Sequence, residues 1–193
     1  MEQLENKIRE EGKVLDGNIL KVSGFLNHQI DLEFLDLMAD ELVRLFKGKN
    51  ITRVLTIESS GIAIACAVAR ILKVPAVFCK KEKTSNVPEG VYSVEIHSFT
   101  HNKDYNVVVS KDYIEKGDKV IVVDDFLANG CALEGLAALI KQAGAEFVGA
   151  GICIEKGFQG GGDRLRKQGM NIQSLAIVEK MYPGKPELTE FRK

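Results

Sequence analysis

Apolar and polar residues follow two periodicities along this chain. Apolar-rich runs predict strands over residues 19–22, 52–57, 75–79, 120–123, 146–154 and 172–178, and the unbroken run at 120–123 is typical of a strand buried on both faces. Apolar residues spaced three to four positions apart predict helices over 2–11, 31–47, 62–72 and 133–142, and a short basic helix precedes Gly169. Strands that alternate with helices predict an α/β domain with a central, mainly parallel sheet flanked by helices.

Residues 80–110 interrupt this alternation. Two segments of alternating polarity, 91–96 and 105–110, predict an antiparallel hairpin joined by the polar residues 100–104. The insertion is long and charged for a connection inside a compact domain. Such an insertion is typical of a mobile lid over an active site.

The most informative stretch is the strand at 120–123 together with the residues directly after it. Two adjacent carboxylates, Asp124 and Asp125, end the strand, and a turn of small residues leads into the next helix: Ala128, Asn129, Gly130, Cys131 and Ala132. A parallel sheet binds ligands beyond the carboxyl ends of its strands, and backbone N–H groups at a helix start face anions. The acids can meet ligand hydroxyls, so the stretch predicts a sugar-phosphate site. The alternative is that the acids only cap the helix.

Two further strand ends carry polar residues. Glu58, Ser59, Ser60 and Gly61 form a polar turn before a helix, an arrangement that suits a second anion such as pyrophosphate, although a plain turn with a serine cap would look the same. Lys80 and Lys81 follow a third strand and could neutralise phosphate charge. A basic pair of this kind is also common on solvated surfaces.

Composition narrows the class of protein. The chain has 193 residues, 45% apolar and 27% charged, which predicts one globular domain with a substantial core. A formal net charge of −1 gives no sign of a nucleic-acid or membrane surface. No apolar run reaches a bilayer-spanning length and the first ten residues are charged, so we expect neither a membrane span nor a signal peptide. Cys66, Cys79 and Cys153 lie in apolar segments and are expected to be buried, reduced thiols, whereas Cys131 belongs to the predicted phosphate turn.

The order of buried strand, two acids, short spacer, phosphate loop and helix resembles the phosphoribosyl-pyrophosphate signature of the type I phosphoribosyltransferases. A wider set of segments resembles the bacterial xanthine phosphoribosyltransferases of that family: 13–22 with 25–31, 56–63, 92–100, 124–130 and 154–158. In two places the chain departs from many members. Its phosphate loop lacks the hydroxyl side chains of their Thr-Gly-Gly-Thr, and Lys80–Lys81 stands where Arg-Lys is common.

The resemblance implies the type I phosphoribosyltransferase fold in a single domain, 1–193. The core would span about 36–180, with a lid at about 80–110. A small hood over the base would come from 1–35 with contributions from 150–193. The implied reaction moves ribose 5-phosphate from phosphoribosyl pyrophosphate to xanthine, giving xanthosine 5′-monophosphate and diphosphate in purine salvage. A cytoplasmic homodimer is implied, with Mg²⁺ entering as the diphosphate complex and not through direct protein ligands.

Roles follow from the same resemblance, residue by residue. Asp124 and Asp125 would hold the ribose 2′ and 3′ hydroxyls and stabilise positive charge on the sugar. Residues 128–132 would bind the 5′-phosphate, while Glu58–Gly61 with Lys80 and Lys81 would bind pyrophosphate. Leu20, Asn27 and Lys156 would line the purine site, although loop hydrogen bonding and a solvated strand end would also explain Asn27 and Lys156.

Two alternatives remain open at this point. The enzyme could transfer to another purine, adenine or guanine. A regulator that senses phosphoribosyl pyrophosphate through the same core is a non-enzymatic alternative, but it would need a DNA-binding module. Only about 50 residues of mixed charge precede the first core strand, with no basic stripe.

Overall fold

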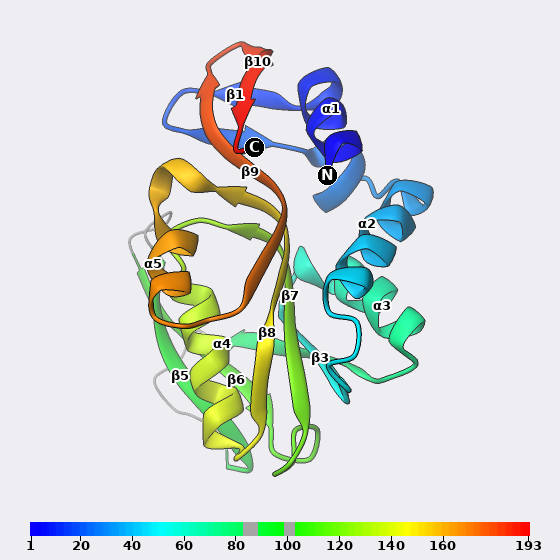
Figure 1. Cartoon of the computed structure of the whole chain (residues 1–193). Coiled ribbons are helices and arrows are strands. Elements are labelled where there is room, and N and C mark those ends of the chain that lie inside the picture. The colour runs from blue at the N-terminus through cyan, green and yellow to red at the C-terminus, as the bar shows by residue number, and fades with distance from the viewer. Residues whose placement is uncertain (83–88, 99–102) are drawn as a thin grey trace.

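The computed structural model describes residues 1–82, 89–98 and 103–193. An eight-stranded sheet forms its centre, in the order β10-β9-β8-β7-β3-β4-β6-β5, and a separate two-stranded sheet, β1-β2, contacts β9 and β10 (Figure 1). The strands are β1 (Lys13–Leu15), β2 (Ile19–Lys21), β3 (Arg53–Ile57), β4 (Ala76–Glu82), β5 (Val91–Ser98), β6 (Lys103–Ser110), β7 (Lys119–Leu127), β8 (Glu146–Lys156), β9 (Ile172–Tyr182) and β10 (Lys185–Phe191). The helices are α1 (Glu2–Glu11), α2 (Leu32–Leu45), α3 (Gly61–Leu72), α4 (Cys131–Gln142) and α5 (Gly161–Lys167), with a π-helical turn η1 (Ser23–Asn27) and a 3₁₀ turn η2 (Gly157–Gln159).

The five central strands, β9-β8-β7-β3-β4, are parallel, as predicted. From β3 the chain first moves outward to β4 and then returns to β7 on the other side of β3. The strand order therefore reverses between β3 and β7. In open α/β sheets a crevice for ligands opens at this reversal, beyond the carboxyl ends of the two strands.

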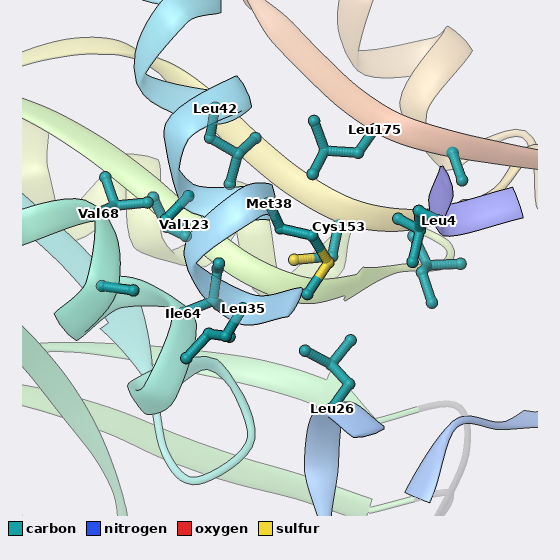
Figure 2. Close-up of a cluster of buried hydrophobic side chains, with 14 of the residues drawn as sticks. Leu4, Leu26, Leu35, Met38, Leu42, Ile64, Val68, Val123, Cys153 and Leu175 are labelled. Atoms are coloured by element: carbon teal, nitrogen blue, oxygen red, sulfur yellow. The ribbon is translucent and has the colours of Figure 1, made fainter. Parts of the chain in front are cut away.

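Two apolar clusters, one on each face of the sheet, hold the domain together. On one face, Met38 and Leu42 of α2 and Ile64 of α3 pack near Val123 and Cys153 of the sheet, and all five side chains are fully buried (Figure 2). On the other face, α4 covers β7, β8 and the β5–β6 hairpin. Burial of both faces explains why β3, β7 and β8 are nearly continuous apolar runs in the sequence.

The hood over the sheet combines both ends of the chain. Helix α1, the β1–β2 hairpin, β10 and the far end of β9 gather at the top of the molecule, where the two termini also lie (Figure 1). Arg9 Nε on α1 donates to the Thr189 carbonyl on β10 at 3.3 Å, and the Arg9 guanidinium lies over the Phe191 ring. Leu4 and Leu26 bring the hood into the same apolar cluster as α2 (Figure 2). The hood is therefore packed onto the core and does not form a separate unit.

Several strands are longer than their apolar runs, and two have no counterpart among the predicted elements. β7 runs on through both acids to Leu127, β8 includes Lys156, and β9 extends to Tyr182. The charged, proline-containing composition of the C-terminal residues predicts a tail, but β10 pairs antiparallel with β9 at the sheet edge. An edge strand can remain mostly polar and can carry Pro186, because one side of it makes no ladder. β1 escapes prediction because three residues give no recognisable period.

The hairpin predicted at 91–96 and 105–110 is confirmed, but its root is part of the sheet. β6 pairs antiparallel with β4, and Ile96 of β5 is buried against α4, where Gly135 leaves room for its side chain. A Cβ at Gly135 would lie 2.4 Å from Ile96 Cδ1. The lid predicted at 80–110 includes residues 83–88 and 99–102, which lie outside the described residues, so a lid motion stays a prediction. No described helix is both long and apolar enough to cross a bilayer.

Candidate active site

Asp124 and Asp125 lie near the end of β7, close enough for their carboxyl groups to interact directly. Asp125, 6% exposed, faces the hood, whereas Asp124 lines a cavity of about 100 Å³ beside the start of α4. The apolar run predicts a strand that ends before both acids, but the ladder continues through them, because Phe126 still pairs with Ile154 of β8. The two carboxylates therefore meet different surroundings.

Asp125 joins the core to the hood. Asn27 ends the π-helical turn η1, and its Nδ2 donates to Asp125 Oδ2 at 3.3 Å, across 98 residues of sequence. Burial of Phe25 and Leu26 holds the turn in place. An amide predicted to face the base thus touches a carboxylate predicted to face the ribose, at the junction that a purine nucleotide would span.

Asp124 is enclosed by the turn that begins α3. A Cβ at Gly61 would lie 2.7 Å from Asp124 Oδ1 and 2.1 Å from Thr56 Oγ1, so only glycine fits there. Loss of solvation, and then repulsion from Asp125, raise the pKa of Asp124 well above its ordinary value, and Lys81 pulls it in the other direction. The Asp125 N–H donates to Asp124 Oδ1 at 2.9 Å, but this bond and Lys81 do not offset the loss of solvation, so ligand hydroxyls or a divalent cation would stabilise the carboxylate further.

The phosphate loop, residues 128–132, connects β7 to α4. Gly130 has φ 91°, a left-handed conformation that favours glycine, and Asn129 Oδ1 accepts from the Cys131 N–H at 3.2 Å. The N–H groups in the first turn of a helix have no partner within the helix. Small side chains leave these groups accessible, so the loop has the geometry of an anion site.

The turn Glu58–Gly61 reaches the end of β4. Glu58 Oε1 accepts from the Lys81 N–H at 2.7 Å, and the Glu58 N–H donates to the Cys79 carbonyl at 3.0 Å. Serines 59 and 60 occupy the middle of the turn, and no side-chain hydrogen bond caps α3. The predicted pyrophosphate turn and Lys81 are therefore side by side, next to Asp124.

Lys80 and Lys81 point in opposite directions, because β4 continues through both. The Lys81 ammonium lies 5.6 Å from the centre of the Tyr105 ring, on the side of Asp124. Lys80 lines a separate groove of about 630 Å³ with Phe78, Val108 and Tyr113. Within one chain the structure brings Lys81 to the site, and leaves Lys80 on another face.

The predicted purine residues lie around the hood side of β7 and β8. Lys156 Nζ donates to the Asn18 carbonyl at 3.1 Å and lies 5.7 Å from the centre of the Phe126 ring. Burial lowers the pKa of Lys156. Leu20 is 6% exposed and belongs to the apolar cluster beneath this region.

Three neighbours of the site escape prediction: Asn18, Tyr105 and Phe126. Phe126 directly follows the two acids, and this position is the only sign in the sequence that it lies near the site. Tyr105 lies near both Asp124 and Cys131; burial first, and then the charge of Asp124, raise the pKa of its hydroxyl. Nothing local in the sequence connects Tyr105 or Asn18 with β7.

The oxygen atoms around Asp124 and Asp125 suit a cation that is already bound to phosphate and water. Among the described residues, no three His, Cys, Asp or Glu side chains cluster as a metal site. Two carboxylates beside an anion loop match Mg²⁺ bound mainly by phosphate and water oxygens. The residues present therefore fit a magnesium complex of a polyphosphate.

The reactivity of Cys131 can report whether a ligand occupies the phosphate loop. Cys79 and Cys153 are buried, as expected, and burial raises the pKa of the Cys79 thiol to about 12, whereas Cys66 is exposed, contrary to expectation, because α3 turns that residue outward. We expect iodoacetamide to label Cys66 and Cys131 but not the two buried thiols. Phosphoribosyl pyrophosphate with Mg²⁺ should protect Cys131 and leave Cys66 unchanged in peptide-resolved mass spectrometry. Equal labelling of Cys131 with and without the ligand would contradict the placement of phosphate at the loop.

Comparison with known proteins addresses the whole arrangement. Residues 26–177 match the phosphoribosyl transferase domain. Xanthine phosphoribosyltransferase of Bifidobacterium adolescentis is 51% identical over 193 residues, covering 100% of both chains. Xanthine phosphoribosyltransferase 2 of Clostridium botulinum (strain Langeland) is 53% identical over 182 residues, 94% of this chain and 96% of its own.

Solved structures agree on the fold. The crystal structure of adenine phosphoribosyltransferase from Rhodothermus marinus superposes with a TM-score of 0.75 at 23% identity, covering 92% of this chain and 100% of that one. The Giardia lamblia enzyme complexed with 9-deazaadenine gives a TM-score of 0.75 at 22% identity, covering 92% and 98%. With a family match over most of its length and relatives that align almost end to end, this chain belongs to the phosphoribosyltransferase family, alongside members named xanthine phosphoribosyltransferase.

Proposed function

We propose that this protein transfers ribose 5-phosphate from phosphoribosyl pyrophosphate to xanthine, releasing diphosphate and xanthosine 5′-monophosphate. The observation that carries the proposal is the contact between Asn27 and Asp125, because it joins a base-facing amide to a ribose-facing acid. The phosphate loop begins three residues after Asp125, so sugar, phosphate and base sites adjoin. Relatives with this activity in their names, about half identical to the chain, support the choice of base.

Phosphoribosyl pyrophosphate would lie across the carboxyl ends of β3, β4 and β7. The N–H groups of residues 128–132 bind its 5′-phosphate, and the turn Glu58–Gly61 with Lys81 holds its pyrophosphate. Lys80 does not reach the pyrophosphate site of the same chain, because it lines a different groove. Mg²⁺, when bound with the diphosphate, would supply positive charge that stabilises the leaving group.

Asp124 and Asp125 stabilise the transition state in this proposal. As the bond to pyrophosphate breaks, positive charge develops on the ribose ring. Two fixed carboxyl groups that bind the 2′ and 3′ hydroxyls lie close to this charge and need little reorganisation. Hydroxyl donors also compensate for the loss of solvation that raises the pKa of Asp124. Lid closure over the site would exclude water that would otherwise hydrolyse the sugar.

Lys156 and Asn27 select the base. Burial lowers the pKa of Lys156, so its ammonium gains from a carbonyl or anionic partner. Xanthine has an additional carbonyl at C2 compared with hypoxanthine and ionises more readily, which matches this requirement. Adenine has no exocyclic carbonyl and would offer the ammonium only neutral ring nitrogens as acceptors.

The proposal also covers the setting of the enzyme. A single phosphoribosyltransferase domain, working as a homodimer in the cytoplasm without nucleic-acid or membrane partners, follows from the resemblance and the near-neutral net charge. Light scattering on the purified protein tests the dimer, because the measured mass should be twice that of one chain.

An activity panel tests the choice of base. With phosphoribosyl pyrophosphate and Mg²⁺, kcat/KM should be highest for xanthine, then lower for guanine and hypoxanthine, and lowest for adenine. Equal values for all four bases would contradict the specificity proposed for Lys156 and Asn27. A preference for adenine or guanine would favour the same transfer to another purine.

A further inference from the structure

The outer side of the phosphate loop rests on α5, a helix to which neither the sequence motif nor the proposed reaction gives a role. A Cβ at Gly161, the first residue of α5, would lie 2.2 Å from the Ala128 carbonyl oxygen. Leu165, fully buried, lies so close to Gly130 that a Cβ there would be 2.7 Å from Leu165 Cδ1. Helix α5 therefore packs directly against the backbone of the loop.

Arg164 of α5 connects the phosphate loop to α4, the helix that follows the loop. Its Nη2 donates to the Asn129 carbonyl at 3.0 Å, and its guanidinium forms a bidentate pair with Glu134 of α4 at 2.7 Å for both bonds. Bidentate pairs of this kind fix the plane of the guanidinium. The Asn129 carbonyl is therefore held in a defined direction relative to α4.

Helix α5 is itself anchored to the sheet. Arg166 forms a bidentate pair with the fully buried Glu155 of β8, at 2.9 and 2.6 Å. Asp163 accepts two bonds from Arg192, near the end of the chain, at 2.6 and 2.9 Å. Because α5 is fixed to the sheet, Arg164 holds the loop in a defined position relative to the sheet.

The direction of each loop carbonyl fixes the direction of the N–H group in the same peptide, and these N–H groups are the ones that would bind phosphate. In a trans peptide the carbonyl and the following N–H point in opposite directions. The Ala128 and Asn129 carbonyls face α5, so the N–H groups of Asn129 and Gly130 face away from it. The loop has no serine or threonine side chain, so its affinity for phosphate depends on how these N–H groups are oriented.

We propose that Arg164 is a positioning residue for the 5′-phosphate: by holding the Asn129 carbonyl and Glu134 together, it directs the Gly130 N–H toward the phosphate. This inference rests on the proposed function, because the phosphate is that of phosphoribosyl pyrophosphate. Arg164 does not touch the ligand. Its guanidinium charge is matched by Glu134, so the orientation of the peptide and not the added charge carries the effect.

Binding of phosphoribosyl pyrophosphate with Mg²⁺, measured by calorimetry without a purine, tests the proposal on the full-length chain. Arg164→Met should weaken binding about tenfold, the effect of losing one well-placed hydrogen bond. Arg164→Lys keeps the charge but cannot bridge both partners, so it should resemble Arg164→Met. In steady-state assays KM for phosphoribosyl pyrophosphate should rise by the same factor, with little change in KM for xanthine.

Two further variants define the comparison. Arg44→Met removes another bidentate surface pair, with Glu41 on α2, and should bind like the wild type. Gly161→Ala inserts a methyl group at the Ala128 carbonyl and should weaken binding selectively, as Arg164→Met does. Wild-type affinity in Arg164→Met would overturn the proposal, as would wild-type affinity in Arg164→Lys, which would assign the effect to charge. Because no purine is present in the calorimetry, a failure to use xanthine would count against the proposed function alone.

Discussion

Replacing Asp125 by asparagine is expected to lower kcat about 100- to 1,000-fold, the usual cost of losing one preorganised electrostatic contact to a transition state. Asp125 is 6% exposed and accepts from Asn27, so its carboxylate is held in place before substrate binds. An amide of the same size keeps the packing but removes the charge that faces the ribose ring in the proposed reaction. The loss should therefore fall on kcat, with KM for xanthine changed little.

Steady-state kinetics with saturating phosphoribosyl pyrophosphate measure this effect. Asp36→Asn is a suitable control, because it neutralises a surface carboxylate paired with Arg70 on the outer face of α2 and α3. The control should leave kcat unchanged. A fall of kcat smaller than about threefold in Asp125→Asn would exclude the electrostatic role, since transition-state contacts are worth far more.

Asn27→Asp is expected to lower kcat/KM for xanthine about 100-fold, because it places a second negative charge where an amide now donates to Asp125 at 3.3 Å. Like charges at this separation repel, and the base loses an amide partner at the same time. Repulsion also raises the pKa of the introduced carboxyl, so its neutral form becomes more common as pH falls. The deficit relative to the wild type should therefore shrink at lower pH.

A pH series of kcat/KM for the variant and the wild type checks both parts of this prediction. Asn6→Asp, on α1 in the same hood, adds the same charge away from β7 and should leave the profile unchanged. Turnover within about threefold of the wild type, or a deficit independent of pH, would argue against the contact between Asn27 and Asp125 as the join of base and ribose sites.

The centre of the fold could be predicted because its strands are local apolar runs. β3, β7 and β8 are buried on both faces, so each appears as an uninterrupted segment, and their parallel order follows from the intervening helices. The same locality applies to the phosphate loop, where acids, turn and helix start are close together in the sequence. The candidate site residues on this stretch could therefore be proposed without tertiary information.

The hood could not be predicted in the same way. Arg9 meets the Thr189 carbonyl across 180 residues, and β10 is a polar edge strand whose one buried side chain is Thr189. Short elements with mixed composition give no periodic signal, and their contacts depend on how both ends of the chain meet. The Asn18 carbonyl accepts from Lys156 and the Asn129 carbonyl accepts from Arg164, and no side-chain motif in the sequence records such contacts.

Lys80 and Lys81 show the same limit of local sequence on a smaller scale. When β4 is taken to end at Cys79, both lysines belong to a loop and both can turn toward phosphate. Because the antiparallel pairing with β6 extends β4 to Glu82, the two side chains alternate, and only Lys81 faces Asp124. Strand pairing with a distant hairpin, and not the local sequence, decided which lysine joins the site.

The proposed function depends above all on the pair of acids on β7 carrying a phosphoribosyl transfer to xanthine. Mass-spectrometric analysis of a reaction containing xanthine, phosphoribosyl pyrophosphate, Mg²⁺ and purified protein tests it most directly. We expect xanthosine 5′-monophosphate and diphosphate in equal amounts from the wild type, and almost none from Asp124→Asn/Asp125→Asn with its fold intact by circular dichroism. Absence of the nucleotide with the wild type, or undiminished formation by the double variant, would refute this role of the acids.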